Sequence, residues 1–332
     1  MNKLFVVCLV SSVVFSACEK AEKEYQKITG KAQGTTYAIT FKGQQRAFSA
    51  EHADSIFQVI DRSMSLWDST SGISRFNKIT DWQEVDEHFQ NVLRKSMEVH
   101  RQSSGAFDPT IGPLSRAWGF IRTNDLPLPD DRTIDSLKQF IGLEKVMLDG
   151  NRVTKQHPAI QLDFNAIAQG YTVDVIAAHL ENKGILNYLI EVGGEVRARG
   201  KNSKGEDWKV GIEKPIQNET GEQNELHSIV SLGTMSLATS GNYRNFLEMD
   251  GKQLSHILNP TTGKPVAHSV VSVSVLAPTC TEADAWATAF TVVGKDKSLA
   301  LAKQLDFELQ IVFKGKQGLE VVRTEGFKKQ LP

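Results

Sequence analysis

EADAWATAF, residues 282–290, is the stretch that most constrains the fold and the chemistry of this chain. It lies in a run of good helix formers over residues 282–293, which Gly294 stops. Asp284 and Thr288 stand four residues apart, so a helix places their carboxylate and hydroxyl on one face, one turn apart. Both groups are hard oxygen ligands of the type that suits Mg²⁺. We therefore expect half of a metal site for a phosphate-bearing ligand here, although such a pair also occurs on helices that hold no ligand.

DFNAIAQGY, residues 163–171, is expected to supply the other half of this site. We predict a strand over residues 159–162 that ends at Asp163, and a helix over residues 167–182 that Gly184 closes. The free N–H groups at a helix start favour anions such as phosphate. A backbone carbonyl near Ala168 is able to complete a metal shell, and Gly170 removes side-chain bulk nearby.

Three further segments carry side chains whose chemistry exceeds what packing needs. Trp67, in the polar segment 64–77, is able to stack on a ring such as adenine or isoalloxazine, or else covers the core. Asp108, in GAFDPTIGPL, accepts hydrogen bonds from a ribose or an amine, or forms an ordinary turn before Pro109. His256 carries a proton or a phosphate contact if it lies beside a phosphate site, and is otherwise a structural histidine.

The pattern of elements predicts an α+β fold of two closely packed lobes, with mixed sheets and flanking helices. Runs of adjacent strands broken by separate helices favour this class over a regularly alternating parallel sheet. No GxGxxG and no Walker loop stands where a strand meets a helix, which argues against a Rossmann or P-loop nucleotide site. The remaining helices are expected at residues 49–66, 83–102 and 296–304, and a loop at residues 123–132. The remaining strands are expected at residues 34–41, 145–148, 188–192, 196–200, 208–213, 229–238, 270–277, 308–313 and 319–322.

The first residues read as an export signal. Lys3 precedes an apolar run over residues 4–15, and Ser16-Ala17-Cys18 follows it, which resembles a bacterial lipobox. We therefore expect residues 1–17 to be a signal peptide, residues 18–30 a tether lipidated on Cys18, and residues 31–332 a single domain. The protein would then be a membrane-anchored lipoprotein of the cell envelope that faces the periplasm. The alternatives are a simple signal peptide and an uncleaved anchor.

Cysteine count and charge exclude several classes of protein. The chain has three cysteines, and the loss of Cys8 and lipidation of Cys18 would leave Cys280 alone, without a disulfide partner. We expect Cys280 to be a small, half-buried packing residue rather than a nucleophile. With 38 basic and 39 acidic residues the net charge is −1, so the sequence shows no basic face for nucleic acid and no polybasic membrane patch.

Nine segments in order along the chain resemble the ApbE family, the FAD:protein FMN transferases. They are GTTY from residue 34, SRFN, GAFDPTIGPL, WGF, IAQGY, EVGGE, TSGNYR, HILNPTTGKP and EADAWATAF. Each segment alone is a weak signal, whereas nine in order cover nearly all of the mature chain. The resemblance implies an α+β fold related to the tunnelling-fold architecture, with FAD in a cleft between the lobes and Mg²⁺ on its pyrophosphate.

The resemblance also assigns roles to individual residues. It implies that Asp284 and Thr288 bind the metal by their side chains and Ala168 by its carbonyl. It implies contacts with FAD at Trp67, Ala106, Phe107, Asp108, Asn165, Gln169, Tyr171 and Leu258. The chain departs from the family pattern at Gln33, where Met is usual, at Asn165, where Gly or Ser is common, and at Gln169, where Lys is common. The lost Lys removes a positive charge near the pyrophosphate.

The implied reaction is attack by a threonine hydroxyl of an acceptor protein on the FMN-side phosphorus of FAD, with release of AMP. Such transfers depend on positioning and charge neutralisation. Asp284 or His256 would take the threonine proton. The implied acceptors are subunits of sodium-pumping NADH:quinone reductase and related complexes. Two alternatives remain open: a Mg²⁺-dependent FAD pyrophosphatase that yields FMN and AMP, and a non-catalytic flavin-binding lipoprotein.

Overall fold

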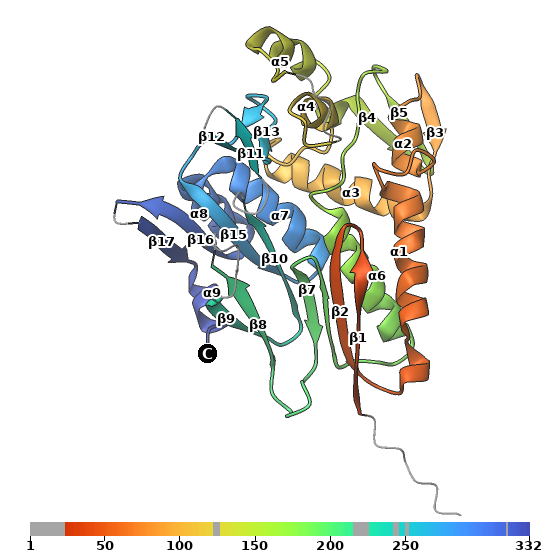
Figure 1. The fold of residues 1–332 in the computed structure, drawn as a ribbon, viewed down its shortest axis with the longest axis vertical. Coiled ribbons are helices and arrows are strands. Elements are labelled where there is room, and N and C mark those ends of the chain that lie inside the picture. Colours follow the sequence, from red (N-terminus) through yellow and green to blue (C-terminus); the bar gives the residue numbers. More distant parts are fainter. Residues whose placement is uncertain (1–23, 122–126, 215–225, 242–245, 250–251, 317) are drawn as a thin grey trace, which may run out of the picture.

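An eight-stranded antiparallel sheet forms the frame of the molecule (Figure 1). The computed structural model describes residues 24–121, 127–214, 226–241, 246–249, 252–316 and 318–332. All neighbouring strands of this sheet run antiparallel. In spatial order the strands are β1 (Tyr25–Ala32), β2 (Thr35–Lys42), β6 (Tyr188–Val192), β7 (Glu195–Arg199), β10 (Met235–Gly241), β15 (Val270–Ala277), β16 (Glu308–Gly315) and β17 (Gly318–Arg323).

Helices cover one face of this sheet. α6 (Ala168–Asn182) packs on β6 and β7, α7 (Cys280–Val293) packs on β10 and β15, and the two helices also contact each other. α1 (Ala50–Met64) lies against α6, and α8 (Lys295–Leu305) against α7. Most residues of α7 are buried, and most of its side chains are apolar. α7 is therefore the central helix of the fold, and its few polar side chains need partners.

The opposite face of the sheet is covered by a two-stranded sheet and a short helix. β8 (Trp208–Glu213), β9 (Leu226–Leu232) and α9 (Glu325–Lys329) close a separate apolar cluster over β7, β10 and β15. The pairing register explains why two layers fit. Leu237 lies opposite Leu276 and faces β8 and β9, whereas Ala238 lies opposite Val275 and faces α7.

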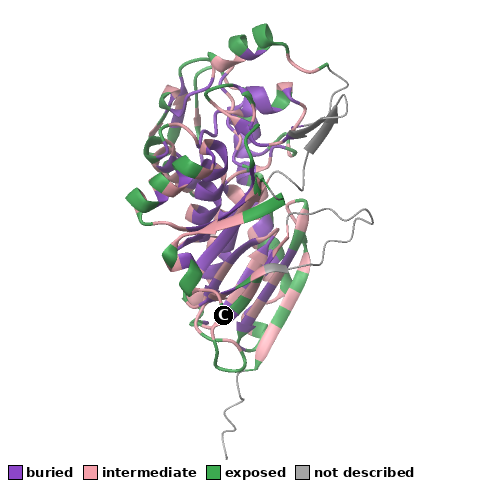
Figure 2. Ribbon diagram, turned by 90° about the vertical axis from the view of Figure 1, so that its left-hand side faces the viewer, coloured by how far each residue is buried: buried purple, intermediate pink, exposed green. Residues whose placement is uncertain are grey.

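The upper part of the molecule in Figure 1 is built from shorter elements. It contains the helices α2 (Gly72–Phe76), α3 (Glu87–Gln102), α4 (Gly112–Ala117) and α5 (Asp131–Lys138), the 3-10 turn η2 (Leu143–Lys145), and the small sheet β3 (Trp82–Glu84), β5 (Arg152–Lys155) and β4 (Val146–Asp149). The other short elements are the 3-10 turn η1 (Gln45–Ala47), the pair β11 (Phe246–Met249) and β12 (Lys252–Ser255), and the pair β13 (Leu258–Asn259) and β14 (Lys264–Pro265). Buried residues run without a break from this part into the large sheet (Figure 2). The predicted α+β class is thus confirmed.

Most predicted elements are present, with three differences. The single strand expected over residues 229–238 is two strands, β9 and β10, which separate around Gly233 and belong to different sheets. Residues 159–162 form no strand; Gln161 makes only an isolated bridge to Ile111. Strand β1 begins at Tyr25, so the expected tether overlaps the sheet at residues 25–30.

The predictions about the chain start fall largely outside the described residues. Cys8, Cys18 and the signal peptide lie there, so export and lipidation remain predictions. Within the described part of the chain, no helix has the length and apolar character needed to cross a membrane.

Candidate functional site

A cavity of about 1220 Å³ lies where the helices, the large sheet and the upper part of the molecule meet. Its walls come from α1, α7, β8, β10, the β6–β7 turn and the loops around residues 106–121, 163–169 and 256–260. Almost all of the predicted site residues line this one cavity although they are distant in sequence. They are Trp67, Ala106, Phe107, Asp108, Asn165, Ala168, Gln169, His256, Leu258, Asp284 and Thr288.

Tyr171 is the exception among the predicted residues, because it is not part of the cavity lining. Its hydroxyl lies 2.9 Å from Nδ1 of His88 and accepts a hydrogen bond from the Asn91 amide at 3.3 Å. Both partners belong to α3. The side chain therefore links α6 to α3, and the structure gives it a packing role.

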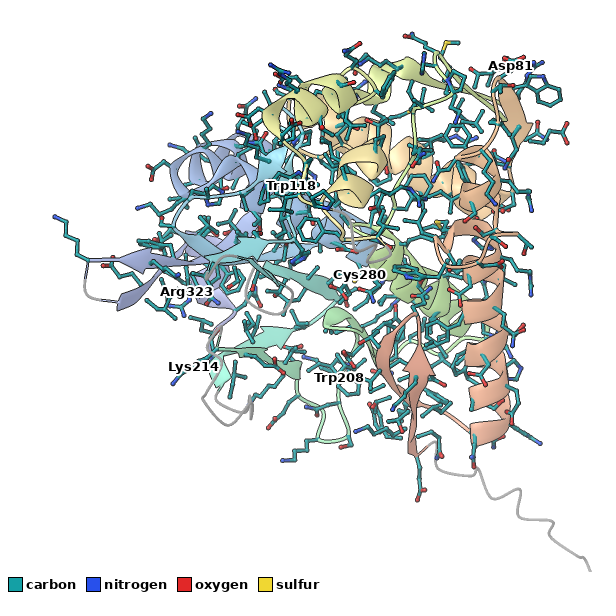
Figure 3. All side chains as sticks on the ribbon, turned by 45° about the horizontal axis from the view of Figure 1, so that its top comes forward. Asp81, Trp118, Trp208, Lys214, Cys280 and Arg323 are labelled. Carbon is teal, nitrogen blue, oxygen red and sulfur yellow. The ribbon has the colours of Figure 1, made fainter. Side chains whose placement is uncertain are left out.

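Close approach of α6 and α7 positions Asp284. The Gly170 N–H donates to Oδ2 of Asp284 at 3.0 Å. A Cβ atom at residue 170 would lie 2.4 Å from the carbonyl oxygen of Cys280 and 2.7 Å from Cβ of Asp284. Only glycine permits this approach, which explains why the sequence has a glycine inside a helix. Cys280 itself is fully buried at the start of α7 near the centre of the molecule (Figure 3), and burial raises the pKa of its thiol, so a packing role rather than a nucleophilic one fits it.

A second contact between α6 and α7 fixes the start of α7. Asp174 accepts hydrogen bonds from the N–H groups of Cys280 and Thr281, at 3.0 and 2.8 Å, and from the Thr281 hydroxyl at 2.5 Å. Arg197 of β7 donates to the same carboxylate at 2.6 Å. Asp174 thus caps α7 from outside that helix, one turn after Gly170. Sequence reasoning missed it, because a cap supplied by another helix leaves no local pattern.

The surroundings of Asp284 suit a hard divalent cation. The carboxyl group is buried, and burial raises its pKa to about 7. Among the described residues no Lys or Arg forms an ion pair with Asp284. The half-buried Thr288 follows one turn later, and the Ala168 carbonyl already accepts one hydrogen bond, from the Thr172 hydroxyl at 2.8 Å. A carboxylate, a hydroxyl and a carbonyl are ligands that fit Mg²⁺ with water or phosphate in the other positions.

A metal held by side chains alone does not fit the cavity. Across the residues that the structure describes, no group of three or more His, Cys, Asp or Glu residues is placed to hold a metal ion. A cation at Asp284 would therefore take most of its ligands from backbone, water or substrate, as is usual for Mg²⁺ at phosphates.

Asp108 and Trp67 differ in what they offer to a ligand. The Asp108 carboxylate accepts hydrogen bonds from the N–H and hydroxyl of Thr110, at 2.8 and 2.5 Å, and from the Leu143 N–H at 3.2 Å, and it lies 3.5 Å from His100. These contacts favour the turn-forming role over hydrogen bonding to a ribose. Trp67 is 62% exposed at the cavity rim, so its ring faces are accessible for stacking.

The sequence reading missed the acidic character of the cavity. Five further carboxyl groups line it, and none of the lining residues within the described part is Lys or Arg. Burial raises the pKa of Asp61 and of Asp163, although hydrogen bonds from Gln33 and Ser115 respectively oppose this effect. Apart from the two glutamates that flank the β6–β7 turn, these acids are distant in sequence, and the fold brings them together. The five are Asp61, Asp163, Glu191, Glu195 and Glu213.

Comparison with known proteins agrees with this geometry. The sequence profile of the ApbE family matches residues 33–313. The chain belongs to the ApbE family. The FAD:protein FMN transferase of Vibrio cholerae is 33% identical over 98% of both chains, and that of Haemophilus influenzae is 33% identical over 99% of this chain and 98% of its own.

Solved ApbE structures share the fold. The flavin transferase ApbE from Vibrio cholerae superposes with a TM-score of 0.83 at 32% identity, covering 93% of this chain and 99% of that one. The apo flavinyl transferase ApbE of Pseudomonas stutzeri gives 0.83 at 31% identity, covering 92% and 96%. All three departures of this chain from the ApbE pattern, Gln33, Asn165 and Gln169, line the cavity. Gln33 donates to the Thr172 hydroxyl at 3.1 Å, so this departure adds a contact to α6 rather than leaving a gap.

Proposed function

We propose that this chain is a flavin transferase that moves the FMN moiety of FAD, in a Mg²⁺-dependent reaction, onto a threonine hydroxyl of an acceptor protein. The threonine oxygen forms a bond to the FMN-side phosphorus, the bond from this phosphorus to the bridging oxygen breaks, and AMP leaves. Family membership supports the reaction class. One observation supports the metal: the buried Asp284 faces an acidic cavity in which the described lining has no Lys or Arg.

The residues of the chain would divide the work as follows. Asp284, Thr288 and the Ala168 carbonyl hold the ion, which when bound supplies charge neutralisation for the pyrophosphate and the departing AMP. Trp67 stacks on a ring of FAD at the rim. His256 takes the threonine proton, because it lines the same cavity and a carboxylate engaged with a metal is a weaker base.

The deciding experiment compares the unsubstituted chain with Asp284→Asn. Each is incubated with FAD, Mg²⁺ and an acceptor subunit of sodium-pumping NADH:quinone reductase, and flavin fluorescence of the acceptor is read in a gel. We expect Asp284→Asn to abolish labelling, and EDTA to have the same effect on the unsubstituted chain. Asp81→Asn is the matched control, since it makes the same charge change on an exposed residue at the far edge of the molecule (Figure 3).

The products separate this function from its alternatives. Free FMN and AMP with an unlabelled acceptor would indicate an FAD pyrophosphatase, and bound FAD without any product a carrier. Labelling by Asp284→Asn at the unsubstituted rate under saturating Mg²⁺ would refute the metal role.

We further propose that the mature protein is anchored to a cell-envelope membrane by a lipid on Cys18, facing the periplasm, where exported acceptors are found. The support is the Ser16-Ala17-Cys18 sequence after an apolar run. We expect the protein to incorporate labelled palmitate and to sediment with membranes. Recovery of unlabelled protein in the soluble periplasmic fraction would show that the anchor is absent.

A further inference from the structure

One strand at the rim of the cavity has an edge that no strand of the described residues pairs with. β8 pairs with β9 only, and no other described strand joins it. Its residues 210–213 line the cavity that also contains Asp284. An open strand edge is a template for pairing with another chain, and proteins usually protect it with charges, proline or a covering segment.

The bonding of β9 shows which groups of β8 face this edge. The Ser231 N–H donates to the Gln330 carbonyl at 2.7 Å, away from β8. In an antiparallel pair, two opposed residues either bond each other or both point away. Lys209 lies opposite Ser231, and Gly211 lies opposite Ile229 two residues further on. The N–H and C=O groups of Lys209 and Gly211 therefore point to the open edge.

Within the part of the chain that the structure describes, the side chains of β8 do not cover this edge. Trp208 and Ile212 are buried in the cluster between the two sheets, so the strand is held firmly from one face. Lys209 and Gly211 are exposed. Gly211 has no side chain, and glycine inside a strand often marks a place where another backbone approaches closely.

A second stretch of backbone in the cavity is less suited to an incoming chain. β10 pairs with β7 only up to Leu237, whereas its pairing with β15 continues to Gly241. Residues 239–241 line the cavity wall and are half-buried. Lys209 and Gly211 of β8 are exposed, so the β8 edge is the more accessible of the two.

We propose that the acceptor protein binds by strand addition to β8, pairing its backbone with Lys209 and Gly211 so that the target hydroxyl enters the cavity. The inference rests on the proposed function, because it concerns the second substrate of flavin transfer. Gly211 belongs to the edge of β8 and also lines the cavity, so an acceptor strand paired with it extends to the cavity. Main-chain bonds would supply the affinity, and alternate side chains of the added strand would face the cavity.

The first test replaces a backbone donor without breaking the existing ladder. In Gly211→Pro the missing N–H is one that points away from β9, so the β8–β9 bonds stay intact. We expect the KM for the acceptor subunit to rise about tenfold, as for the loss of one hydrogen bond, with no matching rise in the KM for FAD. Gly211→Ala keeps the N–H, and its transfer is expected to be faster than that of Gly211→Pro.

The second test needs no substitution. In the full chain labelled with ¹⁵N-glycine, the Gly211 amide is expected to exchange with solvent quickly and to become protected when the acceptor subunit is added, whereas the Gly233 amide is not expected to change. Equal KM values for Gly211→Pro and the unsubstituted chain, or unchanged Gly211 exchange, would overturn strand addition. If the Gly211 amide becomes protected but no flavin is attached to the acceptor, the proposed transfer is refuted and strand addition is supported.

Discussion

At the scale of single residues, the site depends on the close packing of α6 against α7. Asp284, Thr288 and Ala168 were predicted to act together, and all three line one cavity. The prediction was possible because helical spacing and the start of a helix are local features of the sequence. Gly170 makes the arrangement possible by letting its own N–H reach Asp284. The polar chemistry of the site is thus built on a contact that only the smallest residue allows.

Gly170→Ala tests this dependence. The new methyl group would lie 2.4 Å from the Cys280 carbonyl oxygen, a backbone atom that no side-chain rotation can move away. Overpacking of this kind costs about 1–3 kcal/mol, and the separation of the helices would also move Asp284. We expect a lower free energy of unfolding in urea. We also expect Mg²⁺ with FAD to stabilise the variant against urea less than it stabilises the unsubstituted chain. Gly233→Ala is the control, because its Cβ would meet Asp207 at an ordinary 3.5 Å; equal losses in the two variants would contradict the argument.

Residue-level reading failed where a role is set by a distant partner. The carboxylates Asp61 and Glu213 come from α1 and from β8, and nothing near them in the sequence marks a shared cavity. Asp108 shows the opposite case. Its motif was found, but the Thr110 and Leu143 contacts that occupy its carboxylate are visible only in the fold.

At the scale of elements, sequence patterns identified most helices and strands, but they carry no information on which strands pair. Residues 229–238 carry one continuous strand-like sequence, yet β9 and β10 belong to different layers. Period-two alternation reports that a residue is in a strand, whereas the choice of neighbouring strand is decided by long-range packing. The edge position of β8 is likewise known only from the strand pairing in the fold.

Asp174 is the element-scale counterpart of Gly170, because it joins α6, α7 and β7. Asp174→Ala would leave the N–H groups of Cys280 and Thr281 without this acceptor, and Arg197 would keep its ion pair with Glu181 at 3.6 Å. Two partly buried donors without an acceptor and the loss of one ion pair are expected to cost about 3 kcal/mol. We also expect the Mg²⁺ concentration for half-maximal transfer to rise, since α7 carries Asp284.

A remote cap provides the comparison for Asp174. Asp130 caps α5 by accepting from the Thr133 N–H at 2.8 Å on the surface, outside the cavity lining. Asp130→Ala is expected to cost about 1 kcal/mol, the usual value for a helix cap, without changing the Mg²⁺ requirement. A Mg²⁺ requirement for Asp174→Ala that equals the one for Asp130→Ala would mean that Asp174 supports only stability.

At the scale of the whole molecule, the start of the chain shows how far composition can mislead. The charged sequence of residues 19–27 suggested a solvated tether, and the domain was expected to start at residue 31. In the fold, the Tyr25 ring packs edge-on against Trp208 with centroids 5.8 Å apart, and its hydroxyl donates to the Lys201 carbonyl at 2.6 Å. Ile28 packs against the cluster under α6. Charged residues on an edge strand can face solvent while their neighbours face the core.

Two truncated chains separate these interpretations. A chain that begins at Glu24 keeps all of β1, whereas one that begins at Lys31 loses the Tyr25 and Ile28 contacts and leaves most of the β2 edge unpaired. The burial lost by these two side chains is worth about 3 kcal/mol, so we expect a Tm lower by several degrees. An unpaired β2 edge should also promote association, visible as early elution in size-exclusion chromatography. Because both chains lack Cys18, lipid attachment cannot account for a difference between them. Equal Tm values and equal elution would show that residues 25–30 act as a tether after all.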